Sequence, residues 1–208
     1  MTGNTAFWDK MAKRYAAMPI GNQEAYEQTL ERVADHLNGS DSVVEIGCGT
    51  ASTALALAPK VARITATDLS GEMVRIGREK AKAQGVDNIE SLQAGSDDPR
   101  LATGANDVVL AFSLLHLVDD LDQTLADVVG MLKPGGLFIS KTPCLSSMWY
   151  LRPVLPVLRM LGKAPGGVAF CSPEALEAAI RRAGFEIVET GDYPAKTPPR
   201  RFVVARKV

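Results

Sequence analysis

The alternation of two kinds of segment between residues 42 and 142 constrains the fold most. Short runs rich in β-branched residues predict strands at 42–46, 62–68, 88–94, 106–112 and 136–142. Helical segments separate several of these runs, with helices predicted over 71–84 and 121–132. Strands that alternate with helices form a parallel sheet covered on both faces. The sequence therefore predicts a doubly wound α/β fold.

Helical periodicity also marks the first 40 residues. Phe7, Trp8, Met11 and Tyr15 share one face of a segment that ends before Pro19. A second helix is predicted over 23–37, and its His36 is expected to be solvated. These two helices are expected to form an N-terminal cap.

The C-terminal part of the chain predicts a change of strand direction. After a helix that starts at Ser172 and ends at Gly184, strands are predicted at 185–190 and 201–208. Ten residues, which include Pro194, Pro198 and Pro199, join these strands. A parallel crossover needs about a dozen residues or more, and prolines exclude a helix there. The last strand is therefore predicted to lie antiparallel beside its predecessor.

A length of 208 residues predicts one domain, residues 1–208. We divide it into a helical cap (1–40), a core (41–143), an insertion (144–171) and a C-terminal helix and hairpin (172–208). The 23 basic and 24 acidic residues nearly balance, which argues against a dedicated nucleic-acid binder. Three widely spaced cysteines predict neither a disulfide framework nor a metal site. The start lacks the apolar core of a signal peptide, so a cytoplasmic location is expected.

A glycine-rich loop, Gly47 to Ser52, connects the first strand to the following helix. Its glycines permit a tight turn and a close approach of the backbone to a ligand. Asp68 ends the next strand, 21 residues after Gly47, where an acid can bind both ribose hydroxyls. Helix capping beside Ser70 is the alternative role. Loop and acid together favour a nucleoside cofactor across the ends of the first two strands.

Four segments carry a resemblance to a known family. VVEIGCGTAS, TATDLS, NDVVLAFSLLH and KPGG occur in an order and spacing that resembles the class I S-adenosylmethionine-dependent methyltransferases of small molecules. The resemblance covers about residues 40–142, and the C-terminal segments are similar to the closing strands of that family. It implies a Rossmann-like sheet of seven strands, mostly parallel with an antiparallel last strand. It also implies S-adenosylmethionine as the cofactor, S-adenosylhomocysteine as its product, and methyl transfer as the activity.

The resemblance implies a role for individual residues. Glu45 would place the methionine end of the cofactor, the backbone of Gly47 and Gly49 would cradle it, and Asp68 would hold the ribose. Further cofactor contacts are implied for Tyr15, Cys48, Leu69, Met73, Ser96, Asp97, Phe112 and Ser113. Ser96 and Asp97 are the candidates for the adenine, with helix capping by Asp97 or Asp98 as the alternative. Ala51 stands where the family's loop has its third glycine.

Two rival functions remain open. A nicotinamide-dependent oxidoreductase is disfavoured because Ser52 breaks the GxGxxG pattern, and because Glu45 would repel a pyrophosphate but suits an ammonium group. The other rival is a non-catalytic, membrane-peripheral protein that binds the cofactor.

The acceptor is expected to be a small, partly hydrophobic molecule. His116 is the candidate catalytic base, with a structural role as the alternative, and no metal is required. Trp8 is a candidate acceptor contact from the N-terminal helix, as are Trp149 and Tyr150 from the insertion. Neither Cys144 nor Cys171 has an activating neighbour in the sequence.

The apolar segment 145–161 contains Arg152, Pro153, Pro156 and Arg159, so no membrane-spanning helix is predicted. The arginines, seven residues apart, are expected on one helical face. A lid over the acceptor explains this segment best, with a homodimer contact and a membrane-surface helix as alternatives.

Overall fold

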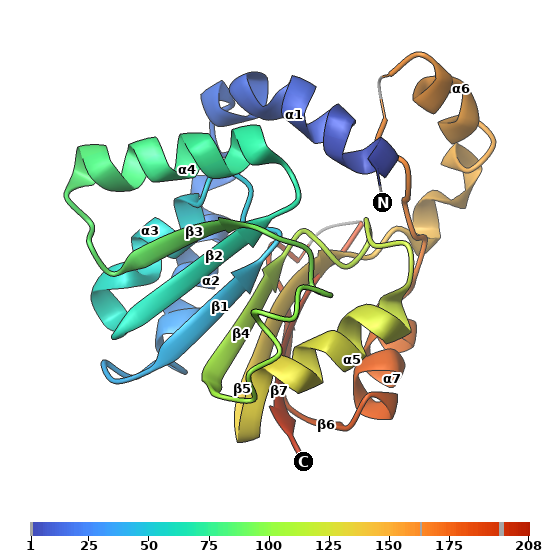
Figure 1. Ribbon diagram of the computed structural model, residues 1–208. Coiled ribbons are helices and arrows are strands. Elements are labelled where there is room, and N and C mark those ends of the chain that lie inside the picture. The colour runs from blue at the N-terminus through green and yellow to red at the C-terminus, as the bar shows by residue number, and fades with distance from the viewer. Residues whose placement is uncertain (1, 163, 196–197) are drawn as a thin grey trace.

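The computed structural model describes residues 2–162, 164–195 and 198–208. Within these residues one mixed sheet forms the centre of the molecule (Figure 1). Its strands are β1 (Ser42–Ile46), β2 (Arg63–Asp68), β3 (Ile89–Gln93), β4 (Asn106–Phe112), β5 (Leu132–Pro143), β6 (Phe185–Asp192) and β7 (Arg200–Lys207). The seven strands lie in the order β3-β2-β1-β4-β5-β7-β6. The predicted strands are thus all confirmed.

The first five strands are parallel, and β7 reverses the direction. It pairs antiparallel with both β5 and β6, and so lies between them. The prediction of an antiparallel last strand beside its predecessor is confirmed. From β1 the sheet order runs outward through β2 to β3 on one side, and it continues from β4 on the other side. The topological switch point therefore lies between β1 and β4, beside the loops that follow these two strands.

Helices cover both faces of the sheet. The chain forms α1 (Thr2–Ala17), α2 (Gln23–Ala34), α3 (Ser52–Leu57), η1 (Ala58–Lys60), α4 (Gly71–Gln84), α5 (Leu121–Met131), η2 (Ser146–Leu151), α6 (Leu155–Met160) and α7 (Pro173–Arg182). Apolar side chains of α5 and α7 pack on one face of the sheet, and those of α2 and α3 pack on the other. Helix α1 lies above the carboxyl ends of the strands, beside α4 (Figure 1).

The start of one predicted strand differs from the structure. The strand was predicted at 136–142, but β5 begins at Leu132. Leu132 pairs with Asn106 and Leu137 pairs with Val108, so the intervening residues form a bulge opposite Asp107. Gly135, with a φ of 75°, supplies the left-handed backbone that this bulge needs.

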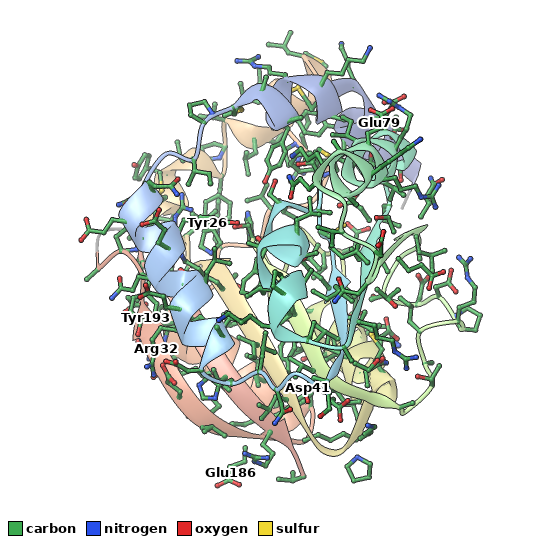
Figure 2. All side chains as sticks on the ribbon, turned by 90° about the vertical axis from the view of Figure 1, so that its left-hand side faces the viewer. Tyr26, Arg32, Asp41, Glu79, Glu186 and Tyr193 are labelled. Atoms are coloured by element: carbon green, nitrogen blue, oxygen red, sulfur yellow. The ribbon has the colours of Figure 1, made fainter. Side chains whose placement is uncertain are left out.

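His36 is not a solvated residue as expected. Its Nε2 lies 2.8 Å from Oε2 of Glu189 on β6. The other carboxylate oxygen of Glu189 accepts a hydrogen bond from Nε of Arg32, at 3.0 Å. Arg32 projects from α2 on the side of the β6–β7 hairpin, near Tyr193 (Figure 2). His36 therefore helps to join the cap to the last strands of the sheet.

The insertion does not form the single helix on which its two arginines were expected to share a face. It is divided into η2 and α6, because Pro153 and Pro156 cannot lie in the interior of one helix. Arg152 stacks over the ring of Phe170, 5.2 Å from its centroid, whereas Nε of Arg159 donates to the carbonyl of Pro165 at 3.1 Å. In the part of the chain that the structure describes, no helix is long and apolar enough to cross a membrane.

Candidate functional site

The loop after β1 and the acid that ends β2 form one hydrogen-bonded unit. Gly47 and Gly49 have left-handed φ angles of 65° and 55°, which glycine adopts without strain. The backbone N–H of Gly49 donates to Oδ2 of Asp68 at 2.9 Å, and that of Ser70 donates to Oδ1 at 2.8 Å. Asp68 therefore both braces the loop and supports the N-terminus of α4, which Ser70 caps through the N–H of Met73.

Each oxygen of Asp68 keeps a lone pair after accepting one backbone hydrogen bond. Burial raises the pKa of this carboxyl, while the two backbone N–H donors oppose that rise. The carboxyl group also lines the main cavity of the site. Asp68 can therefore accept further hydrogen bonds from a bound molecule.

Helix α1 is fixed over this unit by Asp9. Oδ1 of Asp9 accepts a hydrogen bond from Oγ of Ser70 at 2.6 Å and one from the N–H of Glu72 at 3.3 Å. A carboxylate at the N-terminus of α4 is favoured by the helix dipole. The same helix α1 carries Tyr15, whose ring would contact a Cβ added at Gly49 at 3.5 Å. Asp9 thus holds α1, which covers the top of the cavity, against the start of α4.

A cavity of about 280 Å³ lies between α1 and the carboxyl ends of β1, β2 and β4. It has apolar walls and a few polar groups, as small-molecule sites usually do. Eleven of the predicted site residues line it, namely Trp8, Tyr15, Gly47, Gly49, Asp68, Leu69, Met73, Ser96, Asp97, Phe112 and Ser113. The sequence-based selection therefore converges on one place.

Glu45 and Cys48 are not among the residues that line the cavity. Strand alternation turns Glu45 to the face covered by α2 and α3, where its carboxyl group is fully buried and accepts from the backbone of Ala54. Burial raises the pKa of Glu45 to about 8. Its Oε2 has no hydrogen-bond partner among the described residues. Cys48, within the loop, is partly buried against the same face of the sheet, and desolvation raises the pKa of its thiol.

The far end of the cavity is acidic. Oγ of Ser96 donates to Oδ2 of Asp127 on α5 at 2.8 Å, and Asp97 is exposed beside them. Asp98, rather than Asp97, accepts the local backbone hydrogen bond, from the N–H of Arg100 at 2.9 Å. Asp97 is therefore left to face the cavity.

His116 lies next to the cavity wall in sequence but does not line the cavity itself. Burial, together with the charge of Arg200, lowers the pKa of His116 to about 4, so its imidazole is neutral at pH 7. In the described part of the chain Nδ1 of this ring is buried without a partner. The backbone carbonyl of His116 accepts from the N–H of Ala169 at 2.7 Å, which attaches the insertion to this loop.

The insertion contributes no residue to the cavity wall among those described. Trp149 is 67% exposed and Tyr150 is 55% exposed. At the two ends of the insertion lie Cys144, whose Sγ donates to the carbonyl of Thr142 at 3.6 Å, and Cys171, whose thiol interacts with that of Cys144. This contact lowers the pKa of Cys171 and raises that of Cys144.

One wall of the cavity was missed by sequence reasoning. It comes from the loop after β4 and the first turns of α5, and consists of Leu114, Leu117, Val118, Asp119, Asp120, Gln123, Thr124 and Asp127. Asp120 caps α5 through the N–H of Gln123 at 2.9 Å. The signal for this wall was available, because a loop at the carboxyl end of a central strand borders the ligand crevice of such sheets.

The sheet order, the glycine loop and the cavity at the strand ends define a Rossmann-like cofactor-binding protein. The family model for a methyltransferase domain matches residues 43–136. Over these residues the chain is similar to the class I S-adenosylmethionine-dependent methyltransferases. This confirms the resemblance seen in the sequence.

Individual relatives agree with this family. Over 142 residues the chain is 30% identical to a demethylmenaquinone methyltransferase of Symbiobacterium thermophilum, covering 64% of this chain and 55% of that protein. Over 164 residues it is 29% identical to a ubiquinone biosynthesis O-methyltransferase of Xanthomonas axonopodis pv. citri, covering 76% of this chain and 68% of that protein. The chain thus spans only about half the length of the first relative.

The fold also matches a solved structure. A SAM-dependent methyltransferase from Aquifex aeolicus superimposes with a TM-score of 0.67 at 17% identity, over 86% of this chain and 89% of that one. The likeness confirms the predicted seven-stranded fold.

The cavity residues fit the cofactor of the family, S-adenosylmethionine. An added Cβ at Gly47 would lie 2.6 Å from Cδ1 of Leu114, so a side chain there would require Leu114 to move. Gly47 and Gly49 both line the cavity, where only the backbone of the loop meets a ligand. Asp68 has free lone pairs for ribose hydroxyls, and Tyr15 and Trp8 close the cavity from above.

Proposed function

We propose that this protein transfers the methyl group of S-adenosylmethionine to a small, partly hydrophobic acceptor. The observation that carries the proposal is that the glycine loop and Asp68 are hydrogen-bonded to each other and line the same apolar cavity. When bound, the cofactor would supply a methyl group on a positively charged sulfur. An acceptor atom would attack the methyl carbon in line, and the sulfur would leave with the bonding electron pair as S-adenosylhomocysteine. Catalysis then depends on holding the two reactants together and excluding water.

Different residues of the cavity contact different parts of the cofactor. Asp68 accepts hydrogen bonds from the ribose hydroxyls, and the backbone of Gly47 and Gly49 faces the methionine part. Leu69 and Met73 pack beside the ribose and adenine, with Ser96 and Asp97 at the polar edge of the ring. Glu45 lies behind the loop and outside the cavity wall, and burial keeps its carboxyl group mostly protonated at pH 7, so it supports the loop rather than supplying a charge to the ammonium group. Cys48 contributes to the site through its position within the loop.

The acceptor lies at the other end, where Phe112, Ser113 and Trp8 line the cavity. The apolar wall favours a partly hydrophobic acceptor. The relatives named for quinone biosynthesis support the same class. Trp149 and Tyr150 contact the acceptor only if the insertion moves toward the cavity, since both side chains are exposed.

His116 accepts the proton of the acceptor atom when that atom carries one. Its neutral imidazole can bind a proton, and its buried Nδ1 has no partner in the described residues. The role requires the 113–118 loop to turn the ring toward the acceptor, because His116 does not line the cavity.

Thermal unfolding with added ligands tests the proposal. S-Adenosylhomocysteine should raise Tm and NAD or NADP should not, whereas a nicotinamide-dependent oxidoreductase would show the reverse. A screen of small phenols, thiols, amines and prenylated acceptors with a labelled methyl donor would then identify the acceptor. Tight cofactor binding without transfer to any of them would favour a non-catalytic binding protein.

A further inference from the structure

The outer side of the insertion is apolar. Val154, Val157, Met160 and Leu161 are each 45–82% exposed on α6 and its caps, and Trp149 and Tyr150 add two exposed aromatic side chains from η2. We call these six residues the outer patch. Leu151, Leu155 and Leu158 recur on the opposite, partly buried side of the same segment. The segment is therefore apolar on both sides but is covered on only one.

The position of the outer patch leaves it open to large partners. Helix α6 lies at the edge of the molecule, beyond the N-terminal end of α1 (Figure 1). The segment is attached where the insertion begins and ends. The N–H of Cys144 donates to the carbonyl of Pro199 at 2.9 Å, and the N–H of Ser146 donates to the carbonyl of Cys171 at 3.2 Å. The patch thus projects from an anchored base.

The charge of the insertion has a single sign. Arg152 and Arg159 border the outer patch and are exposed, and the sequence adds Lys163, whose structure lies outside the described residues. No acidic residue occurs in the sequence between Asp127 and Glu174. The whole chain has a net charge of −1, so this basic region is a local feature.

We infer that the outer patch docks on the surface of an anionic lipid bilayer. Exposed aromatic and aliphatic side chains bordered by arginines are the composition that binds the interface between headgroups and acyl chains. The inference goes beyond the proposed methyl transfer and does not depend on it.

Charge argues against a second copy of the chain as the occupant. In a two-fold symmetric dimer through this patch, the basic insertions of both copies would lie together, with no acid of either insertion to neutralise Arg152 and Arg159. An anionic lipid surface supplies the missing negative charge.

Sedimentation with vesicles tests the inference. The full chain is mixed with vesicles of phosphatidylcholine alone, or with about 30% phosphatidylglycerol, at low salt. We expect about tenfold stronger binding to the anionic vesicles, lost at about 0.5 M salt. Equal binding to both vesicles, or binding to neither, would overturn the inference.

Two variants and their controls locate the contact. The double variant Val157→Ser/Met160→Ser should weaken binding about tenfold, while Val188→Ser, on exposed β6, should not. Arg152→Gln/Arg159→Gln should remove the preference for anionic vesicles, and Arg182→Gln on α7 should retain it. Unchanged S-adenosylhomocysteine binding would show that each variant is folded. Unaltered vesicle binding by both double variants would overturn the inference.

Fluorescence gives an independent measurement. The chain has two tryptophans, Trp8 in the cavity and Trp149 in the outer patch. In the variant Trp8→Phe, anionic vesicles should shift the emission of Trp149 to the blue. A concentration-dependent dimer that produces the same shift without vesicles would instead identify a second copy as the occupant, and so refute lipid docking.

Discussion

Asp68 holds Gly49 in place across the gap between two strands. The carboxylate at the end of β2 accepts the N–H of Gly49 at 2.9 Å, so the loop after β1 depends on a residue from the neighbouring strand. The same carboxylate accepts the N–H of Ser70 at 2.8 Å, at the start of α4. One side chain therefore fixes the relative positions of both segments at the end of the cavity where we propose that the ribose binds.

Asp68→Ala should weaken S-adenosylhomocysteine binding at least about tenfold, a loss near 1.4 kcal/mol. The variant loses the acceptor for ribose hydroxyls and also the brace on Gly49. Calorimetric titration measures the change. Asp87→Ala is the matched control, because Asp87 is exposed and lies outside the cavity wall. Equal affinities of wild type and Asp68→Ala would remove Asp68 from the binding site.

Glu45→Gln should stabilise the protein at alkaline pH. Burial raises the folded-state pKa of Glu45 from 4.5 to about 8, so between these values the folded state binds more protons than the unfolded state. Unfolding free energy attributable to Glu45 therefore falls as pH rises through this window. Urea unfolding at pH 5 and pH 8 should show that Glu45→Gln exceeds wild type by ~2 kcal/mol at the higher pH only. Parallel pH dependence of the two proteins would contradict the assignment.

Ala51 and Gly77 should be energetically coupled. Ala51 has a left-handed φ of 57°, and a Cβ added at Gly77 on α4 would lie 3.1 Å from its Cβ. Gly77→Ala gains helix propensity of about 1 kcal/mol but meets this contact, so it should be neutral or destabilising alone. In the background Ala51→Gly the contact is absent, and Gly77→Ala should stabilise. A double-mutant cycle from chemical unfolding measures the coupling, and additive effects would count against it.

Asp9→Ala should loosen the roof of the cavity. The variant removes the hydrogen bonds from Ser70 and Glu72 that fix α1 on the N-terminus of α4, a loss of about 1 kcal/mol. We expect faster proteolysis within α1 and about fivefold weaker S-adenosylhomocysteine binding. Lys10→Ala, at an exposed position of the same helix, serves as the control. Equal proteolysis of the two variants would show that α1 is held by other contacts.

The sequence was most informative where local patterns decide the structure. Strands and the helix from Gly71 to Gln84 were predicted because apolar periodicity, Ser70 as a cap and Gly85 as a left-handed end all act within a few residues. Asp68 could be located because the end of a parallel strand must meet the loop of its neighbour. The predicted antiparallel hairpin likewise followed from the prolines that connect it.

Tertiary packing decided what the sequence left open. Glu45 lies on the opposite side of β1 from Ile46, so its burial under α2 and α3 depends on which face these helices cover. The wall formed by Asp120 and Gln123 depends on how α5 docks, and the thiol contact of Cys144 with Cys171 joins the two ends of the insertion. No local pattern carries such distances.

His116 can be tested by separating catalysis from stability. Its folded-state pKa of about 4 lies below the ordinary 6.5, so the unfolded state binds more protons as pH falls between these values. Stability from the neutral ring is therefore present above pH 6.5 and is lost as pH falls toward 4, whether or not His116 is a base.

Catalysis by the neutral imidazole should stay constant from pH 8 down to about 5, and His116→Gln should lower kcat about 100-fold without changing S-adenosylhomocysteine affinity. His36→Gln is the matched control, because Nε2 of His36 contacts Glu189 and His36 does not line the cavity, so this variant should keep full activity. If His116→Gln keeps its kcat and loses only the pH dependence of stability, then the histidine is structural and the acceptor reaches the methyl group already deprotonated.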